Sequence, residues 1–364
     1  MNTKITQVIT YLEEIAPVCY QDSYDNSGLL VGNPDTALKK GLICLDVTQS
    51  VMDEAIQTNC NLIISHHPLI FNPLKKITGN TPCENLIIQA IKNDIVIYAL
   101  HTNLDNVLGG VNQRFADCLG LKNSRILQPA QNNLCKLVTY IPVNHVDSVR
   151  ESLFLAGAGS IGNYTSCSYN TEGYGTFKAN ENANPFVGNK NEVHQEKEIR
   201  TEMIFPIHFK NQIISALLKN HPYEEPAFDL IPLANTNATV GAGMIGELET
   251  AMNEADFLLF LKKQLQLSCI KHSKTSGKKI KKVAVCGGSG AFLIAEAVRQ
   301  KADIFISSEL KHNHFIDYSE AILLTDIGHF ESEIQTKFLL YEILIKKFST
   351  FAVSVKEENP ILYL

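Results

Sequence analysis

The sequence predicts an α/β protein whose core has two corresponding halves, interrupted by an inserted ferredoxin-like α+β domain. Three observations lead to this fold class. Short apolar runs alternate with helical patterns over residues 40–119, and the same alternation returns in the C-terminal third. The stretch between them differs and includes a long segment rich in Gly, Asn and Ser. With 364 residues, the chain is long enough for two or three ordinary domains.

In the first half, strands are expected to alternate with helices. Residues 5–15 carry apolar side chains at helical spacing and stop before Pro17, which predicts an amphipathic helix and not a signal peptide. The elements expected next are a strand at LICLDV, a helix over 51–59, a strand at LIISHHPLIF, a helix over 83–93 and a strand at IVIYALH. Such alternation is typical of a mostly parallel sheet covered on both faces.

The C-terminal third has a similar order. Its expected elements are a strand and Gly-rich turn at KKVAVCGGSG, a helix over 292–301, strands at ADIFISSEL and AILLTDIGHF, and a long helix over 332–347. The first two strands begin 20 residues apart in the first half, at Leu42 and Leu62. In the second half they begin 21 residues apart, at Val283 and Ile304. Two explanations stay open: a duplication that faces one site, or the general likeness of any two βαβ units.

Residues 129–235 are predicted to form the inserted domain. Its expected elements are a strand at KLVTYIP, a helix over 146–155, a Gly-, Asn- and Ser-rich stretch over 156–191, a strand over 199–207, a helix over 212–220 and a strand at AFDLIPL. The order strand, helix, strand, strand, helix, strand is that of a ferredoxin-like domain. The core is then discontinuous and comprises residues 1–128 and 236–364.

Composition excludes several classes of protein. The chain has 32 basic and 38 acidic residues, a net charge of −6, so no nucleic-acid or anionic-membrane partner is expected. No apolar run reaches the roughly 18 residues that a membrane helix requires. Nine cysteines without a CxxC pair favour a reducing compartment, and we expect a cytoplasmic protein.

Adjacent histidines, His66 and His67, follow a predicted buried strand and form the strongest local motif. Successive side chains at a strand end diverge, so the two imidazoles could each serve one of two neighbouring metal ions. A lone histidine at a strand end more commonly has a hydrogen-bonded structural role. The metal interpretation therefore depends on other candidate ligands that lie near the same sheet edge.

Two pairs supply such candidates: His101 with Asp105, and His329 with Glu333, each four residues apart and each following an apolar strand. We expect a tight turn at the first pair and a helix at the second. Imidazole and carboxylate ligands favour Zn, Mn, Fe, Co or Ni. Either Asp105 or Glu333 could bridge two ions, and water activated between the ions favours hydrolysis. Asp326 is a candidate for holding a metal ligand in place.

Other motifs carry weaker predictions. The CGGSGA turn at 286–291 is compatible with an anion site and equally with a structural turn. Cys286 fits a buried thiol better than a nucleophile, because no histidine is placed to activate it. HPYEEPAF at 221–228 is interpreted as a helix-ending turn, with His221 outside the metal site.

Several motifs together resemble the NIF-three-like proteins, often labelled GTP cyclohydrolase 1 type 2 homologues. The motifs are SYDNSGLLVG at 23–32, LDVT at 45–48, SHHPLIF at 65–71, HTNLDNVLGGVN at 101–112, VCGGSGA at 285–291 and GHFESE at 328–333. In the insert, AGAGSIGNYTSCSYNTEGYGTF and HPYEEPAFDLIPL look like the PII/CutA-like domain of longer bacterial members. The resemblance covers nearly the whole chain.

The resemblance implies a pseudo-symmetric α/β/α core, two divalent metal ions per chain and a toroidal homohexamer. It places metal ligands at His66, His67, Asp105, His329 and Glu333, with His101 beside the metals as an auxiliary residue. The implied activity is metal-dependent hydrolysis of a purine nucleotide or related phosphorylated compound, such as addition of water at purine C8 with loss of formate. Two alternatives stay open: a metal-binding regulatory or interaction protein without turnover, and a metal chaperone.

The chain departs from the family pattern at two places. Tyr24 stands where a tryptophan is frequent. The segment at residues 307–309 reads Ser-Ser-Glu in place of Thr-Gly-Asp/Glu, and it is followed by His312 and His314. These two histidines are either substrate contacts or surface residues.

Overall fold

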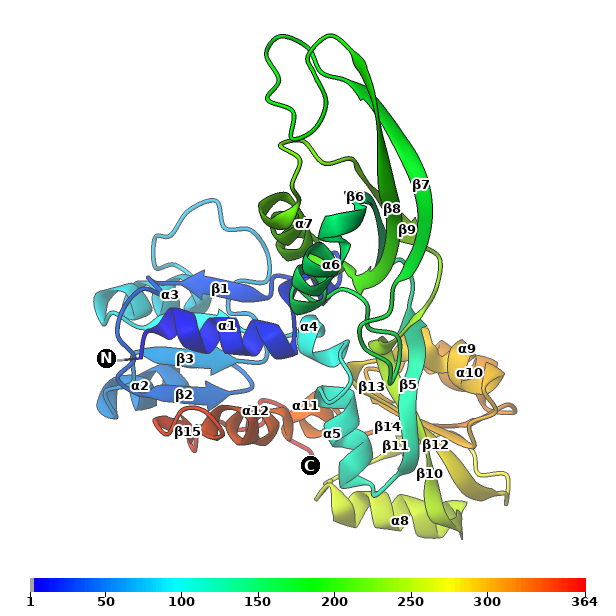
Figure 1. The fold of residues 1–364 in the computed structure, drawn as a ribbon. Helices are drawn as coiled ribbons and strands as arrows, with labels where there is room; N and C mark the ends of the chain where they lie inside the picture. The colour runs from blue at the N-terminus through cyan, green and yellow to red at the C-terminus, as the bar shows by residue number, and fades with distance from the viewer. Residues whose placement is uncertain (1–2) are drawn as a thin grey trace. The chain divides into compact units, whose positions relative to one another are not determined.

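The computed structural model describes residues 3–364, which divide into two compact units. One unit is discontinuous and comprises Met1–Pro129 and Ala238–Leu364, while Ala130–Asn237 form the other. Figure 1 shows the chain coloured along its length, with the second unit in green. We call them the core unit and the insert unit.

The first sheet of the core unit has the strand order β1-β4-β3-β2-β15. Its strands are β1 (Gly28–Val31), β2 (Gly41–Cys44), β3 (Leu62–Ser65), β4 (Val96–Ala99) and β15 (Phe351–Val353). All run parallel except β1, which is antiparallel to β4. The accompanying helices are α1 (Ile5–Ile15), η1 (Val18–Tyr20), α2 (Gln49–Gln57), α3 (Pro82–Lys92) and α12 (Thr336–Ile345).

Helices cover both faces of this sheet because its strands are apolar on both sides. On one face, Leu42, Ile63 and Ile97 belong to one buried cluster with side chains of α2 and α3. On the other face, the Tyr98 hydroxyl donates to the Glu13 carboxylate of α1 at 3.0 Å. The predicted α1 boundaries are confirmed.

Helices α2 and α3 begin earlier than the periodicity alone predicts. Thr48 accepts a hydrogen bond from the Val51 amide, and Thr81 accepts one from the Glu84 amide. A threonine at this position satisfies a backbone donor that the first turn leaves unpaired, so it fixes where each helix starts.

The second sheet of the core unit has the order β11-β14-β13-β12-β10-β5. Its strands are β5 (Lys122–Ala130), β10 (Asn237–Asn253), β11 (Lys271–His272), β12 (Lys279–Ser289), β13 (Ile304–Ser308) and β14 (Leu323–Asp326). Strands β12, β13 and β14 are parallel, and β11 is antiparallel to β14. The run β2-β3-β4-β1 has the same order and directions as β12-β13-β14-β11.

Two helical layers also enclose the second sheet. The remaining helices of the core unit are α4 (Thr102–Asp105), α5 (Val111–Cys118), α8 (Glu254–Gln264), η4 (Ala291–Leu293), α9 (Ile294–Arg299), α10 (His312–Tyr318) and α11 (His329–Glu333). Val283 and Ile304 pack in one cluster with α5 and α8, whereas Ala284 and Phe305 pack in another with α9. Alternate side chains of each strand thus enter opposite layers.

The prediction of one long helix over 332–347 is wrong. The chain forms α11 and α12 instead, and the two helices pack against different sheets. Helix α11 contacts β12 and β13, whereas α12 contacts β15 and β2. One continuous helix could not follow both surfaces.

The insert unit contains an antiparallel sheet with the order β7-β8-β6-β9. Its elements are β6 (Leu134–Pro142), η2 (Val143–His145), α6 (Val146–Leu155), β7 (Tyr169–Lys178), β8 (Val193–Pro206), η3 (Ile207–Phe209), α7 (Lys210–Asn220) and β9 (Phe228–Leu233). The order of strands and helices along the chain is the one predicted. Helices α6 and α7 pack on one face of the sheet, in a cluster with Met203 and Phe205.

Strand β7 lies in the Gly-, Asn- and Ser-rich stretch over 156–191 and completes the predicted order, although no bounds were predicted for it. Ten consecutive residues of β7 pair with β8, so cross-strand pairing outweighs the low strand propensity of Gly173 and Gly175. None of the helices described in residues 3–364 combines the length and apolarity that a transmembrane span requires.

Candidate metal centre

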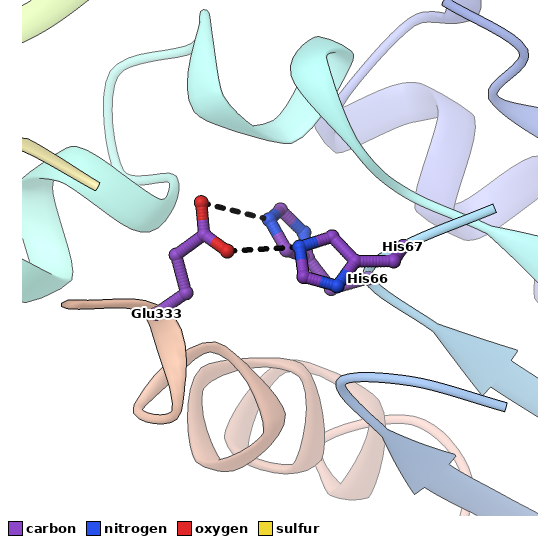
Figure 2. Close-up of side chains that lie close together, drawn as sticks. All are labelled: His66, His67 and Glu333. Carbon is purple, nitrogen blue, oxygen red and sulfur yellow. Dashed lines mark hydrogen bonds and ion pairs between the residues drawn. The ribbon is translucent and has the colours of Figure 1, made fainter. Parts of the chain in front are cut away.

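Side chains that follow both sheets of the core unit meet in one buried cluster. His66 and His67 come directly after β3, and Asp105 ends the short helix α4 that follows β4. His329 and Glu333 lie on α11, which follows β14. Figure 2 shows the Glu333 carboxylate facing the two adjacent imidazoles. The carboxyl ends of parallel strands therefore deliver all five predicted ligands to one place.

Glu333 lies at the centre of this cluster, and its side chain is only 3% exposed. Its Oε1 is 3.7 Å from His66 Nε2. Its Oε2 is 2.9 Å from His67 Nε2 and 3.0 Å from His329 Nε2. One carboxylate thus contacts three imidazoles through two different oxygens.

The outer nitrogen of each imidazole is held by an acceptor. His66 Nδ1 lies 2.7 Å from the Leu100 carbonyl oxygen, and His67 Nδ1 lies 2.8 Å from Asp46 Oδ1. His329 Nδ1 lies 3.0 Å from Glu309 Oε1. If Nδ1 carries the proton that it donates outward, Nε2 presents a lone pair to the cluster. This arrangement fixes the ring orientation that a metal-binding histidine needs.

Five buried side-chain polar atoms have no hydrogen-bond partner within residues 3–364, and two of them lie in this cluster. These two are His66 Nε2 and Asp105 Oδ1, which lie 3.7 Å from each other. Leaving such atoms unpaired in the interior is costly, and nearly all buried polar atoms in proteins are satisfied. A divalent cation would satisfy both. The residues therefore fit a metal, and His66, His67 and Glu333 offer ligand atoms within 4.8 Å of one another.

The side chains of the cluster shift one another's pKa values. Burial and the nearby Glu333 charge raise the pKa of Asp105 well above its usual value. Although burial opposes ionisation of Glu333, the neighbouring imidazoles hold its pKa well below the usual value. Burial lowers the pKa of His67, but its hydrogen bonds to Asp46 and Glu333 outweigh burial and raise that pKa to about 10. For His329, the contact with Glu333 similarly outweighs burial and raises the pKa to about 9.

Cation binding should release protons. With pKa values of about 10 for His67 and about 9 for His329, both imidazoles are protonated at pH 7 in the ion-free protein. A ligand nitrogen must lose its proton, so we expect these two imidazoles to release about two protons per chain and the affinity to rise between pH 6 and pH 9. Calorimetric titrations with Mn²⁺ in buffers of different ionisation enthalpy measure this release. Heats that do not depend on the buffer would contradict the prediction.

His101 lies beside the cluster. It precedes α4, a short helix where the sequence predicted a tight turn. Its ring centroid is 5.4 Å from that of His66 and 5.5 Å from that of His67. His101 Nδ1 lies 2.6 Å from Asp25 Oδ1, and Asp25 also accepts hydrogen bonds from Thr102. Burial of Asp25 is outweighed by the His101 and Thr102 contacts, which lower its pKa.

The CGGSGA turn is structural, because its amides are already engaged. The Gly287 amide donates to Asn112 Oδ1, the Gly288 amide to Ser332 Oγ and the Gly290 amide to Ser307 Oγ. Gly288 has a φ of +62°, and a Cβ added there would collide with Glu333 Oε1. The absence of a side chain at this turn therefore leaves room for the Glu333 carboxylate.

Gly288→Ala should reduce metal binding. The added methyl group would displace Glu333, and we expect the affinity for Mn²⁺ to fall by roughly 10- to 100-fold. Gly277→Ala is the matched control, since Gly277 also has a positive φ, +79°, but has no atom near its added Cβ. Both variants carry a backbone cost of about 1–2 kcal/mol. Equal metal affinity in the two variants would show that Gly288 does not shape the site.

The other predicted residues lie outside the cluster. Asp326 does not hold a ligand: it accepts from the Gly328 and Leu310 amides and pairs with Lys271 at 3.1 Å. Its carboxylate therefore fixes the turn that leads into α11. His312 is exposed, and His314 Nδ1 accepts from the Lys311 amide.

Two further predictions are settled by burial and hydrogen bonding. Cys286 is buried, and burial raises the pKa of its thiol well above the usual value, as expected of an unreactive cysteine. His221 lies in the insert unit and donates to the Tyr140 carbonyl oxygen through Nε2.

Three residues that hold the imidazoles were not predicted from the sequence: Asp46, Asp25 and Glu309. Asp46 comes just after β2, so its position at a strand end was the available signal. Asp25 lies 76 residues before His101 and has no such signal.

The fold and the cluster define a class of α/β protein with a buried group of imidazoles and carboxylates that could hold a metal. The chain belongs to the Duf34/NIF3 (NGG1p interacting factor 3) family, whose model matches residues 3–360.

Curated relatives and a solved structure agree with this assignment. A Halalkalibacterium halodurans protein is 41% identical over 324 residues, covering 88% of this chain and 87% of the relative. A Bacillus subtilis protein is 37% identical over 368 residues and covers 98% of both. Both are named "GTP cyclohydrolase 1 type 2 homolog". The crystal structure of a Bacillus cereus protein related to NIF3 has a TM-score of 0.86 and 35% identity, and the match covers 100% of both chains.

Proposed function

We propose that this protein is a metal-dependent hydrolase that binds two divalent ions per chain and acts on a purine nucleotide or a related phosphorylated compound. One observation carries the metal part of the proposal: His66 Nε2 and Asp105 Oδ1 are buried beside Glu333 without a hydrogen-bond partner among residues 3–364. The names of the relatives support the substrate class, since they refer to a GTP cyclohydrolase.

Glu333 would be the ligand common to both ions. Its Oε1 lies on the side of His66, which is also close to Asp105. Its Oε2 lies on the side of His67 and His329. This donor set of nitrogen and carboxylate oxygen fits Zn, Mn, Fe, Co or Ni.

His101 is proposed to move a proton during the reaction. Two divalent ions held by these residues would supply the Lewis acidity for hydrolysis at neutral pH. The Asp25 carboxylate holds His101 Nδ1, so Nε2 is the nitrogen that remains for proton exchange. Hydrogen bonds from Thr102 and Ser27 fix Asp25 in turn.

Incubating the metal-loaded protein with GTP and a panel of nucleotides, followed by mass spectrometry, tests the activity. We expect a product from at least one purine nucleotide, and no product from Glu333→Gln. If wild-type protein with about two bound ions turns over nothing on the panel, the hydrolase proposal fails. A metal-binding regulatory protein or a metal chaperone would then account for the site.

The proposal includes a toroidal homohexamer and a PII/CutA-like insert over residues 129–235, with the core formed by 1–128 and 236–364. Light scattering coupled to gel filtration should give six times the mass of one chain, and a monomer would contradict it.

The nine cysteines are all free, which supports a reducing compartment such as the cytoplasm.

A further inference from the structure

A cavity of about 640 Å³ lies wholly within the insert unit, which contains none of the proposed metal ligands. Residues of β7 and β8, together with Tyr140 of β6, line it. The rest of the lining comes from the loops that follow β7 and α7, including Phe186 and Tyr223. This volume is in the range of sites that bind small molecules.

Glycines in β7 leave space in the cavity. Gly173 pairs with Glu198 of β8, and residues directly opposite each other in a sheet share a face. A Cβ added at Gly173 would have no atom within 4 Å, so open space lies in front of this residue. Gly175 lies two residues further along the same face, and an added Cβ there would meet Glu198 Oε2.

The cavity contains a buried carboxylate that can accept more hydrogen bonds than it receives. Glu198 is 7% exposed. The Tyr223 hydroxyl donates to Glu198 Oε1 at 2.7 Å, and this is the only hydrogen bond to that carboxylate within residues 3–364. Ionised carboxylates can accept several hydrogen bonds, and burying one without compensation is costly. A cationic ligand group next to Oε2 would supply the missing partner.

Aromatic rings surround the space beside this carboxylate. The Tyr223 ring centroid lies 6.1 Å from that of Phe177 and 6.3 Å from that of Phe186. Ring faces attract organic cations, most strongly where the cation leaves water. The cavity thus combines apolar surface with a negative group, which is the combination that selects an ammonium ion with an apolar body.

The charged residues of the lining are mostly acidic. Four carboxylates line the cavity against two basic side chains: Glu172, Glu198, Glu224, Glu225, Lys178 and Arg200. Arg200 is paired with Glu202 at 3.0 Å, and Glu172 is paired with Lys197 at 2.8 Å. Three carboxylates, those of Glu198, Glu224 and Glu225, then remain against Lys178. An anionic ligand would meet a net negative lining.

We propose that this cavity binds an organic ammonium ion that carries an aromatic or apolar body. The ammonium group pairs with Glu198, and the body packs against Phe177, Phe186 and Tyr223. The proposal does not depend on metal binding or on hydrolysis in the core unit.

The full-length chain has no tryptophan, so Phe186→Trp places a single fluorescent reporter on the cavity wall while keeping an aromatic ring there. Three probes of similar shape differ in charge: 2-phenylethylammonium, 2-phenylethanol and 3-phenylpropanoate. We expect a saturable fluorescence change with the cation, at least about tenfold weaker binding of the alcohol, and no saturation with the anion.

Variants in the same background identify the site. Glu198→Gln should bring the cation and the alcohol to nearly equal affinity, and Gly173→Leu should abolish binding by filling the cavity. Glu196→Gln is the control, because it changes a carboxylate on the same strand that does not line the cavity. It should leave binding unchanged.

Three results would overturn the proposal. One is equal binding of alcohol and cation to the Phe186→Trp protein, and another is no saturable response to any probe. The third is a tryptophan signal that changes with protein concentration alone, because a second copy of the chain would then cover the cavity. If Glu198→Gln fails to fold, the comparison of Gly173→Leu with Glu196→Gln still decides whether the probe enters this cavity.

Discussion

Glu333→Gln should empty the metal centre. The variant keeps the size of the side chain but removes the charge that contacts His66, His67 and His329. Because a metal ligand contributes more than the groups that merely orient it, we expect the affinity for Mn²⁺ to fall by more than about 100-fold. Elemental analysis after dialysis against metal-free buffer should show a decrease from about two ions per chain to almost none.

Glu331→Gln is the matched control. Glu331 lies on the same helix and accepts a hydrogen bond from Asn359, outside the cluster. It should retain wild-type metal content. If Glu333→Gln keeps two ions with wild-type affinity, Glu333 is not a ligand and the proposed bridging role is wrong. Circular dichroism of both variants separates loss of metal from loss of fold.

The grouping of the five candidate ligands could be anticipated because parallel strands impose it. Every βα unit exposes its carboxyl end at the same edge of the sheet, so polar residues that follow apolar strands converge. His66, His67 and Asp105 follow strands of one sheet, whereas His329 and Glu333 follow a strand of the other. The hydrophobic pattern was sufficient to find the strands that precede these residues. Their position directly after those strands was sufficient to select them as candidate metal ligands.

Position after a strand could mark Asp46 and Glu309 as polar candidates, but it could not show which imidazole each one contacts. Asp46 contacts His67 across 21 residues of sequence, and Glu309 contacts His329 across 20. Such contacts depend on how neighbouring loops pack, and no spacing rule specifies them. Glu309 has a positive φ of 57°, which depends on the same local packing.

The insert unit shows a different limit of sequence reasoning. Glycines at 173 and 175 favour an irregular segment by local propensity, yet pairing with β8 makes this segment a strand. The same glycines leave space beside Glu198, so the residues that obscured the strand also create the cavity. A one-dimensional pattern does not distinguish a flexible glycine from one that leaves room for a ligand.

Glu357→Ala should destabilise the core unit strongly and weaken the metal centre. The Glu357 side chain is 1% exposed and pairs with Lys337 at 3.2 Å. It also accepts hydrogen bonds from the Leu45 and Asp46 amides, at 2.7 and 2.6 Å, just after β2. Removing it leaves two amides unpaired and a buried ammonium without its counter-ion, so we expect a loss of about 3–5 kcal/mol in the free energy of unfolding. Urea unfolding followed by circular dichroism measures the loss.

The contact with Asp46 links this stability effect to the site, because Asp46 holds His67. We therefore expect metal affinity in Glu357→Ala to fall by roughly 10-fold even under conditions where the variant is fully folded. Glu358→Ala changes the exposed neighbour and should alter neither quantity. In Lys337→Met/Glu357→Ala the buried charge is removed with its partner, so much of the lost stability should return. A double variant as unstable as the sum of the two single variants would show that the ion pair is not what holds the C-terminal segment against β2.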